Sequence, residues 1–272
     1  MKLLICTDGS SASIQTADLI LKMKFLPDTR ITILGVTESK NDLDSIASSM
    51  DQIEKLLNLK YIIDRKIRNG DPIEGIMSEA LEAKYDLVAV GGGGKHVGLL
   101  DPQLGSTTSN LARKLHTHFL VARNVPTVIK KVLFCTGAEA PARKTMTTGG
   151  QWISNAEVQI GLLHVLSQVS GDKQKGEAKP ENTVESGKEI QDSILLQASQ
   201  QLRNAGVKNE IIPRIRQGLV VEEILSELTE GRYELLVIGA HYQPGQDRWQ
   251  GTLLDDVTDQ LLNRCNCSVL IV

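Results

Sequence analysis

The chain contains two copies of one pattern of apolar segments, and this repeat limits the possible folds more than any other feature. Each copy has about five apolar segments of strand length in the same order. The matching segments are Leu3–Asp8 with Val132–Gly137, Arg30–Val36 with Gln159–Val165, Asn69–Ile76 with Gln217–Ile224, and Phe119–Ala122 with Val269–Val272. In a chain of 272 residues the repeat predicts two domains, residues 1–125 and residues 128–272.

Between these segments the apolar period becomes helical. The clearest example has apolar residues at steps of three and four, which places them on one helix face: Leu43, Ile46, Met50, Ile53 and Leu57. Alternating strands and helices with short loops predict parallel sheets with right-handed crossovers and helices on both faces. Aromatic residues make up only 3% of the chain, so the core must be aliphatic, as buried parallel sheets are. We therefore expect an α/β protein with two tandem, doubly wound, parallel five-stranded sheets of Rossmann-like type.

Two segments interrupt the repeat. The connection Arg123–Thr127 is too short and too apolar for a free linker, so we expect the domains to pack on each other. Residues 167–188 are rich in Lys, Glu, Gly and Ser and lack an apolar period. They predict a flexible surface insertion in the second domain.

Charge and cysteine content exclude several classes of protein. A net charge of −3 gives no general attraction to nucleic acid or to an anionic membrane. We expect no membrane span, because no apolar run is long enough, and no signal peptide, because the N-terminus runs directly into a strand. Four cysteines are too few for a disulfide scaffold. Cys265 and Cys267, if extended, point to opposite faces, which argues against a shared metal or a mutual disulfide. A reducing, cytoplasmic setting fits these features best.

A glycine-rich loop follows the fourth strand of the first copy. Gly91–Gly94 comes directly after an apolar run, and Gly105-Ser106 opens the next helix. In doubly wound sheets this end binds ligands, and helix N-termini there offer free N–H groups to phosphates. The loop is not a Walker A motif, because His96 stands where Ser or Thr is required, and no register gives a dinucleotide fingerprint. A turn whose glycines only permit strand and helix to pack remains the alternative.

These residues resemble the universal stress protein family, whose signature is Gly-x2-Gly-x9-Gly-[Ser/Thr] after the fourth strand. Here Gly91 and Gly94 have the family spacing, but ten residues rather than nine separate Gly94 from Gly105-Ser106. Thr7-Asp8-Gly9-Ser10 and Gly70-Asp71-Pro72 also resemble the family, and the resemblance covers both halves. It implies an adenine nucleotide alpha hydrolase-like fold.

The resemblance also implies ATP as ligand, with Mg²⁺ inferred only from the nucleotide. It places Asp8 near the adenine and ribose, and the Val36 backbone against the adenine. It places four residues around the phosphates, with Thr107 as a weaker candidate: Gly91, Gly94, Gly105 and Ser106. Asp8 could instead cap the following helix. Lys95 and His96 have no place in the signature, and solvent-exposed side chains are the simpler interpretation of both.

The second copy departs from the family pattern. Gly137 replaces the aspartate, Tyr242 stands where the second loop glycine should be, and Gly251-Thr252 follows at a shorter spacing. We therefore expect the second domain to bind ATP weakly or not at all. Family dimers commonly pair through their last strands. Phe119–Ala122 and Val269–Val272 could pair in this way within one chain and form a pseudo-dimer. Further homodimerisation stays open.

Three functions remain open on the sequence. The first is an ATP-binding regulatory or stress-response protein, with nucleotide in the N-terminal domain. The second is an enzyme that uses ATP, such as a slow ATPase. The five histidines show no general-base or metal spacing, so no catalytic residue or metal ligand is assigned. The third is a nucleotide-free scaffold that binds protein partners.

Overall fold

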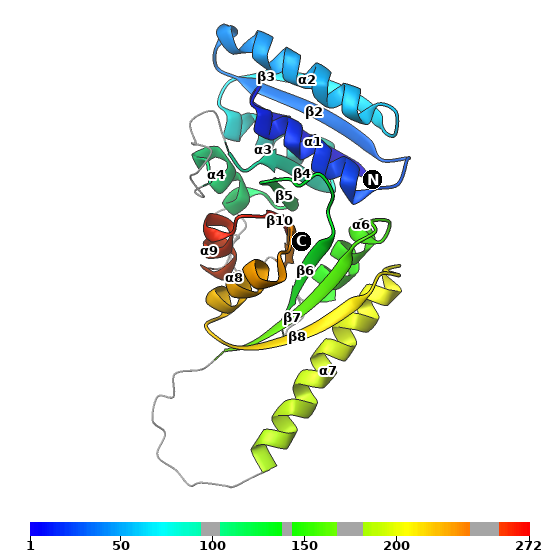
Figure 1. Cartoon of the computed structure of the whole chain (residues 1–272). Helices are drawn as coiled ribbons and strands as arrows, with labels where there is room; N and C mark the ends of the chain where they lie inside the picture. The colour runs from blue at the N-terminus through cyan, green and yellow to red at the C-terminus, as the bar shows by residue number, and fades with distance from the viewer. Residues whose placement is uncertain (94–103, 138–142, 168–181, 240–255) are drawn as a thin grey trace.

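The computed structural model describes residues 1–93, 104–137, 143–167, 182–239 and 256–272. The strands form one continuous ten-stranded sheet in the order β3-β2-β1-β4-β5-β10-β9-β6-β7-β8 (Figure 1). Pairing is parallel within each half. The first half contributes β1 (Lys2–Thr7), β2 (Arg30–Thr37), β3 (Ile62–Asn69), β4 (Leu87–Gly91) and β5 (His118–Ala122). The second contributes β6 (Lys131–Thr136), β7 (Gln159–Ser167), β8 (Ile211–Gly218), β9 (Leu235–Ile238) and β10 (Ser268–Ile271). Each half has the predicted five parallel strands.

The halves meet through their last strands. β5 and β10 pair antiparallel, with Leu120 opposite Leu270 at the centre of the ladder. Each half would otherwise expose this strand edge, which is a template for aggregation. The predicted pseudo-dimer within one chain is confirmed.

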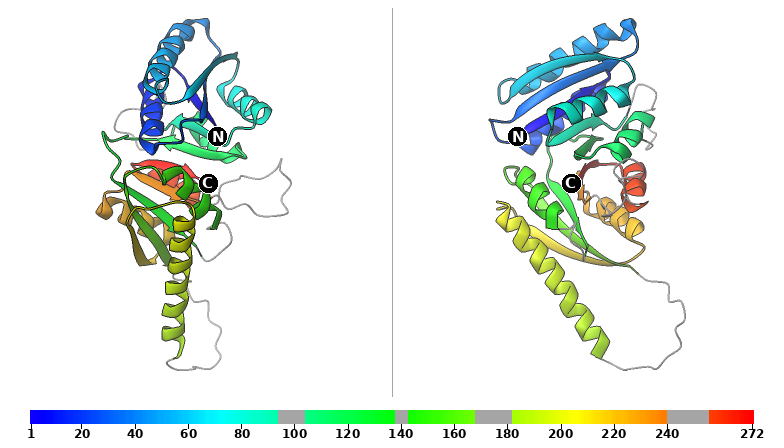
Figure 2. Two further views of the ribbon diagram at one scale, coloured as in Figure 1. Left: turned by 90° about the vertical axis from the view of Figure 1, so that its right-hand side faces the viewer. Right: turned by 180° about the vertical axis from the view of Figure 1, so that it is seen from behind.

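Helices cover both faces of the sheet (Figures 1 and 2). One face carries α1 (Ser11–Met23), α2 (Leu43–Leu57), the short η2 (Thr145–Gly149), α6 (Gly150–Ile153) and α7 (Asn182–Asn204). The other carries α3 (Pro72–Ala83), α4 (Ser106–Lys114), α8 (Val220–Gly231) and α9 (Asp256–Arg264). A further short helix, η1 (Lys40–Asp42), precedes α2. The inner strands are largely buried on both faces, which explains their continuous aliphatic character, whereas the outer strands β3 and β8 are mostly exposed.

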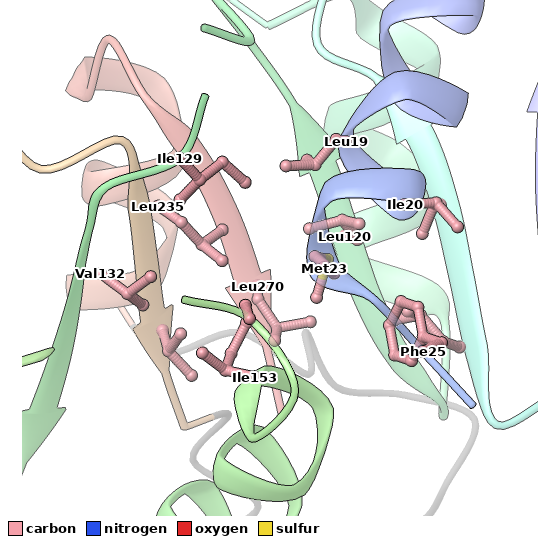
Figure 3. Packing of buried hydrophobic residues seen from close by; sticks show 14 of the residues in the cluster. Leu19, Ile20, Met23, Phe25, Leu120, Ile129, Val132, Ile153, Leu235 and Leu270 are labelled. Atoms are coloured by element: carbon pink, nitrogen blue, oxygen red, sulfur yellow. The ribbon is translucent and has the colours of Figure 1, made fainter. Parts of the chain in front are cut away.

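The core on each face runs without a break from one half to the other. Figure 3 shows the α1 face, where Leu120 and Met23 of the first half lie near Leu270, Leu235 and Ile153 of the second. Each fully buried Leu or Ile side chain contributes about 1.5–3 kcal/mol. The halves therefore share one core, which confirms the expectation that they pack on each other.

The outer strands β3 and β8 carry charged residues that pair with a buried carboxylate. Glu79 of α3 is fully buried and accepts hydrogen bonds from Lys66 Nζ at 2.6 Å, Arg68 Nη2 at 2.7 Å and the Tyr85 hydroxyl at 2.8 Å. Burial alone would raise the pKa of the Glu79 carboxyl, but donation by these neighbours outweighs it and the pKa is lowered. The cluster anchors α3 to the edge strand.

The second half contains the same cluster. Glu227 of α8 accepts from Arg216 Nε at 2.7 Å and from the Tyr233 hydroxyl at 3.2 Å, and Arg214 Nε lies 3.6 Å away. The two clusters occupy equivalent positions in the repeat. Charged side chains on both outer strands also discourage edge-to-edge association.

The expected insertion at residues 167–188 is shorter than predicted. Ser167 is the last residue of β7, and α7 begins at Asn182. Residues 168–181 lie outside the described residues. The sequence did not predict the start of α7, because its first turns are polar and lack the apolar period that the later turns have. In the part of the chain that the structure describes, no helix has the length and apolar character needed to cross a membrane.

Candidate functional site

The candidate site lies at the carboxyl edge of the first half, where the strand order reverses. From β1 the sheet continues to β2 and β3 on one side and to β4 and β5 on the other. The parallel register brings the ends of β1 and β4 to the same edge, so Asp8 and Gly91 follow neighbouring strands. Such switch points are where doubly wound sheets bind ligands.

A buried hydroxyl cluster fixes the loop that carries Asp8. Thr7 Oγ1 lies 2.8 Å from Ser13 Oγ and 2.8 Å from Ser49 Oγ, and it accepts the Gly9 N–H at 3.1 Å. Asp8 Oδ1 accepts the Ser10 N–H at 2.9 Å. The N-cap of α1 is Ser10 rather than Asp8. The Asp8 carboxylate thus stabilises the turn that precedes α1, a role close to the helix cap considered from the sequence. Asp8 remains half-buried at the edge of the sheet.

The three described loop glycines have different surroundings. A Cβ on Gly91 would lie 2.7 Å from Ala12 Cβ of α1, and a Cβ on Gly92 would lie 2.4 Å from Arg123 Cγ. Packing alone therefore requires glycine at Gly91, where backbone atoms of Ala12 stand in the way, whereas at Gly92 the Arg123 side chain would have to move. A Cβ on Gly93 would meet no atom of the described residues within 4 Å. With respect to that part of the chain, the backbone of Gly93 is accessible, as close approach of a ligand would need. Gly94, Lys95 and His96 lie outside the described residues.

The start of α4 faces the end of β4. Gly105 is the N-cap, and its carbonyl accepts the Ser109 N–H at 3.0 Å. The N–H groups of Ser106, Thr107 and Thr108 therefore have no acceptor within the helix. Thr108 Oγ1 donates to the Gly91 carbonyl at 3.1 Å, which ties the helix start to the loop. The first turn of α4 contains no acidic residue, so its positive dipole end is not neutralised locally.

Val36 lies near the end of β2, one strand further along the same edge. Its side chain is buried against α3, where a Cβ on Gly75 would come within 2.7 Å of Val36 Cγ1. Only the Val36 backbone is left to meet a ligand. The structure therefore gathers most of the expected residues at one edge: Asp8, Val36, Gly91, Gly105, Ser106 and Thr107.

The same edge of the second half is built differently. Helix α9 has the same length as α4 and the same separation from the last strand, so Asp256 occupies the place of Ser106. Its first turn carries two carboxylates, Asp256 and Asp259. Asp256 complements the helix dipole and would repel a phosphate, whereas Asp259 is paired with Arg113 of α4. Tyr242, Gly251 and Thr252, on which the sequence comparison rested, lie outside the described residues.

His164 also distinguishes the second edge. It stands at the place of Gly35 in the repeat, is buried, and its Nδ1 lies 3.0 Å from the Thr136 carbonyl. An imidazole therefore occupies space beside the end of β6, three residues before the end of β7. A Cβ on Gly35 would lie 2.3 Å from Ile46 Cγ2, so the first half has no room for such a side chain. Sequence reasoning missed both the carboxylates and His164. Aligning the two copies backwards from their last strands would have shown that Asp256 matches Ser106.

The Cys265–Cys267 segment is not extended. The sequence argument about opposite faces applied only to an extended segment. The segment forms a bend between α9 and β10, and Cys265 Sγ lies 3.7 Å from the Cys267 carbonyl oxygen. The argument from opposite faces therefore does not apply, although both thiols are free. Within the described ranges, no three His, Cys, Asp or Glu side chains gather in a way that could hold a metal ion.

Comparisons with known proteins agree with this architecture. A universal stress protein from Archaeoglobus fulgidus DSM 4304 has a similar structure, with a TM-score of 0.63 and 15% identity, over 99% of this chain and 95% of that one. A putative universal stress protein from Pseudomonas aeruginosa UCBPP-PA14 gives 0.69 and 13%, over 100% and 92%. A protein of unknown function from Pseudomonas aeruginosa PAO1 gives 0.71 and 14%, over 100% and 92%. At these identities the likeness establishes the fold.

The sequence comparisons give the family. A search of curated proteins finds no match to this chain. The model of the universal stress protein family matches twice, over residues 1–123 and 129–272, which together span nearly the whole sequence. The chain therefore belongs to the universal stress protein family, as a tandem protein with two family domains.

Proposed function

We propose that this protein is an ATP-binding regulatory protein of the stress response, with the nucleotide held by the N-terminal domain. The observation that carries the proposal is the edge at the switch point between β1 and β4. There Asp8, the accessible backbone of Gly93 among the described residues, and the N-terminus of α4, whose Gly105 cap makes no side-chain hydrogen bond, occur together. The proposal keeps domain boundaries at residues 1–125 and 128–272, and a cytoplasmic setting.

Each group has a role that follows from its chemistry. The Asp8 carboxylate accepts from a ribose hydroxyl or the adenine amine, and the Val36 backbone meets the adenine edge. The α4 N–H groups and the Ser106 and Thr107 hydroxyls donate to phosphate oxygens. Gly91 and Gly94 keep the backbone accessible, Gly94 on sequence grounds alone. Mg²⁺ would accompany the triphosphate, as it does for most ATP.

The C-terminal domain is proposed to lack this activity. Asp256 places negative charge at the start of α9, where a phosphate would bind, and His164 occupies space at the end of β6. Gly137, after β6, supplies no carboxylate in place of Asp8. We therefore expect one ATP for each chain.

Calorimetry with Mg-ATP and full-length protein tests the proposal, using a matched pair of variants. Gly93→Val and Gly137→Val both add a side chain where a Cβ meets no atom of the described residues within 4 Å, so both should fold. Gly93→Val should weaken ATP binding at least about tenfold, which is ~1.4 kcal/mol, and Gly137→Val should leave it unchanged.

Three outcomes would contradict the proposal in different ways. Absence of binding to folded protein at millimolar Mg-ATP would leave the nucleotide-free scaffold as the better reading. Two equivalent sites would refute the asymmetry between the domains. Steady phosphate release that falls with Asp8→Ala would favour the slow ATPase.

A further inference from the structure

Arg123 connects the glycine loop of the first domain to helix α9 of the second. Its side chain packs directly on Gly92, because a Cβ there would lie 2.4 Å from Arg123 Cγ and 2.6 Å from Nε. The Gly92 N–H donates to the carbonyl of Ala122, the residue before Arg123, at 2.8 Å. Arg123 therefore lies against the phosphate loop, at the end of β5, although the sequence placed it in the connection between the domains.

The second domain holds the guanidinium in this position. Arg123 Nη1 donates to the carbonyls of Leu262 at 2.8 Å and Cys265 at 2.9 Å, at the C-terminus of α9. These carbonyls lie at the C-terminus of α9, where backbone carbonyls accept no hydrogen bond from within the helix. They also carry the negative end of the helix dipole. The Arg123 N–H and carbonyl also bond to Ser268 Oγ, each at 3.1 Å. Helix α9 thus fixes a cation beneath a loop of the other domain.

The charge of Arg123 is not neutralised by a carboxylate among the described residues. Its neighbours are backbone carbonyls and the thiols of Cys265 and Cys267. The second terminal nitrogen, Nη2, is buried without a hydrogen-bond partner. Burial lowers the pKa of Arg123, yet a guanidinium stays protonated at neutral pH. Within the described residues, the buried cation is therefore held by carbonyl oxygens and not by an opposite charge.

We propose that Arg123 sets the preference of the site for the number of phosphates, by supplying fixed positive charge beneath the glycine loop. The inference rests on the proposed function and adds two things to it. The ligand is selected by the charge of its phosphate chain, and α9 of the second domain completes the site of the first. Arg123 acts through the field that it adds to the loop, and it is a specificity-determining residue.

The test measures the affinity of the full-length protein for ATP, ADP, AMP and adenosine. In the unmodified protein affinity should rise with each phosphate. Arg123→Gln should weaken ATP about tenfold or more, AMP less, and adenosine little, because Coulomb attraction grows with ligand charge. Arg123→Lys keeps the charge and should keep most of the gradient. A residue that only supports the fold would change all four affinities by the same factor.

Arg113→Gln is the matched control. Arg113 of α4 also reaches α9, but Asp259 neutralises it through hydrogen bonds of 3.0 and 2.9 Å. Its loss should leave the phosphate gradient intact. If Arg123→Gln does not fold, Gly92→Ala replaces it, because the added Cβ displaces the Arg123 stem and should flatten the gradient in the same way.

The possible failures are distinguishable. If the unmodified protein binds none of the four ligands, the proposed function is wrong and this inference with it. If it binds them and the gradient persists in Arg123→Gln, or in Gly92→Ala, only the inference is wrong. A uniform loss across the ligands would also overturn it.

Discussion

The outer strands of the two domains are alike, whereas the carboxyl edges of their sheets differ. In both domains a buried glutamate, Glu79 or Glu227, is paired with basic side chains of the edge strand and with a tyrosine. At the carboxyl edge, α4 begins with Ser106 and no acidic residue, whereas α9 begins with Asp256. The charge clusters occur in both halves and therefore belong to the duplicated fold. The features suited to binding an anion occur in one half only.

The largest expected effect concerns the shared feature. Glu79→Ala removes the acceptor of the buried Tyr85 hydroxyl and of two partly exposed cations, Lys66 and Arg68, and should reduce the free energy of unfolding by about 1.5–3 kcal/mol. Glu227→Ala should cost a similar amount, because Arg216 loses the equivalent partner. Urea denaturation of both variants measures this. If only one variant were destabilised, the clusters would not be equivalent and the comparison would fail.

A smaller effect tests the feature that differs. Ser106→Asp places a carboxylate at the start of α4 and should weaken ATP binding about tenfold or more, through repulsion of the phosphates. The same change should stabilise the fold by about 0.3–1 kcal/mol, because an acidic side chain complements the helix dipole. Calorimetry and thermal unfolding measure the two effects separately. Asp256→Ser is the control, with a slight loss of stability and unchanged ATP binding. Parallel changes in stability and affinity would contradict the proposed repulsion.

The smallest effect concerns the contact between the halves. His118 of β5 packs edge-on against Trp152 of α6, with ring centroids 5.1 Å apart. Burial, together with nearby Lys144, lowers the pKa of His118 from 6.5 to about 4, and Asp86 opposes this. Between these two values the unfolded chain binds a proton that the folded protein does not. His118 therefore favours the folded state above pH 6.5, and this contribution is lost as the pH falls toward 4.

Because His118 is partly exposed, we expect a loss on the order of 1 kcal/mol. Urea denaturation at a series of pH values measures it. His118→Gln should remove this part of the pH dependence. An unchanged profile would show that His118 does not titrate at the interface.

Much of the fold could be predicted from the sequence, because it depends on local periods and on repetition. The apolar steps in Leu43–Leu57 correspond to α2, and the matching last segments predicted the β5–β10 ladder. The bend at Cys265–Cys267 and the early start of α7 could not be predicted, since neither has an apolar pattern of its own.

The site was predictable in part for the same reason. The position of Gly91 after the fourth strand follows from strand order, and so does its place beside Asp8. The position of Arg123 under Gly92 does not, because it arises only when β5 and β10 pair and bring α9 to the loop. The unlike starts of α4 and α9 become visible only when the helices are aligned by their place in the fold.

The β5–β10 ladder has a consequence for the way the protein is made. It joins strands that lie at the ends of the two halves, so the ladder can form only after Ile271 has left the ribosome. Until then the N-terminal half carries Phe119 and Leu120 on an uncovered strand edge. Two nascent chains on one messenger RNA could pair through that edge before either has completed its second half. The rate of synthesis and the spacing of ribosomes on one messenger RNA should therefore affect the yield of protein in which β5 pairs with β10 of the same chain.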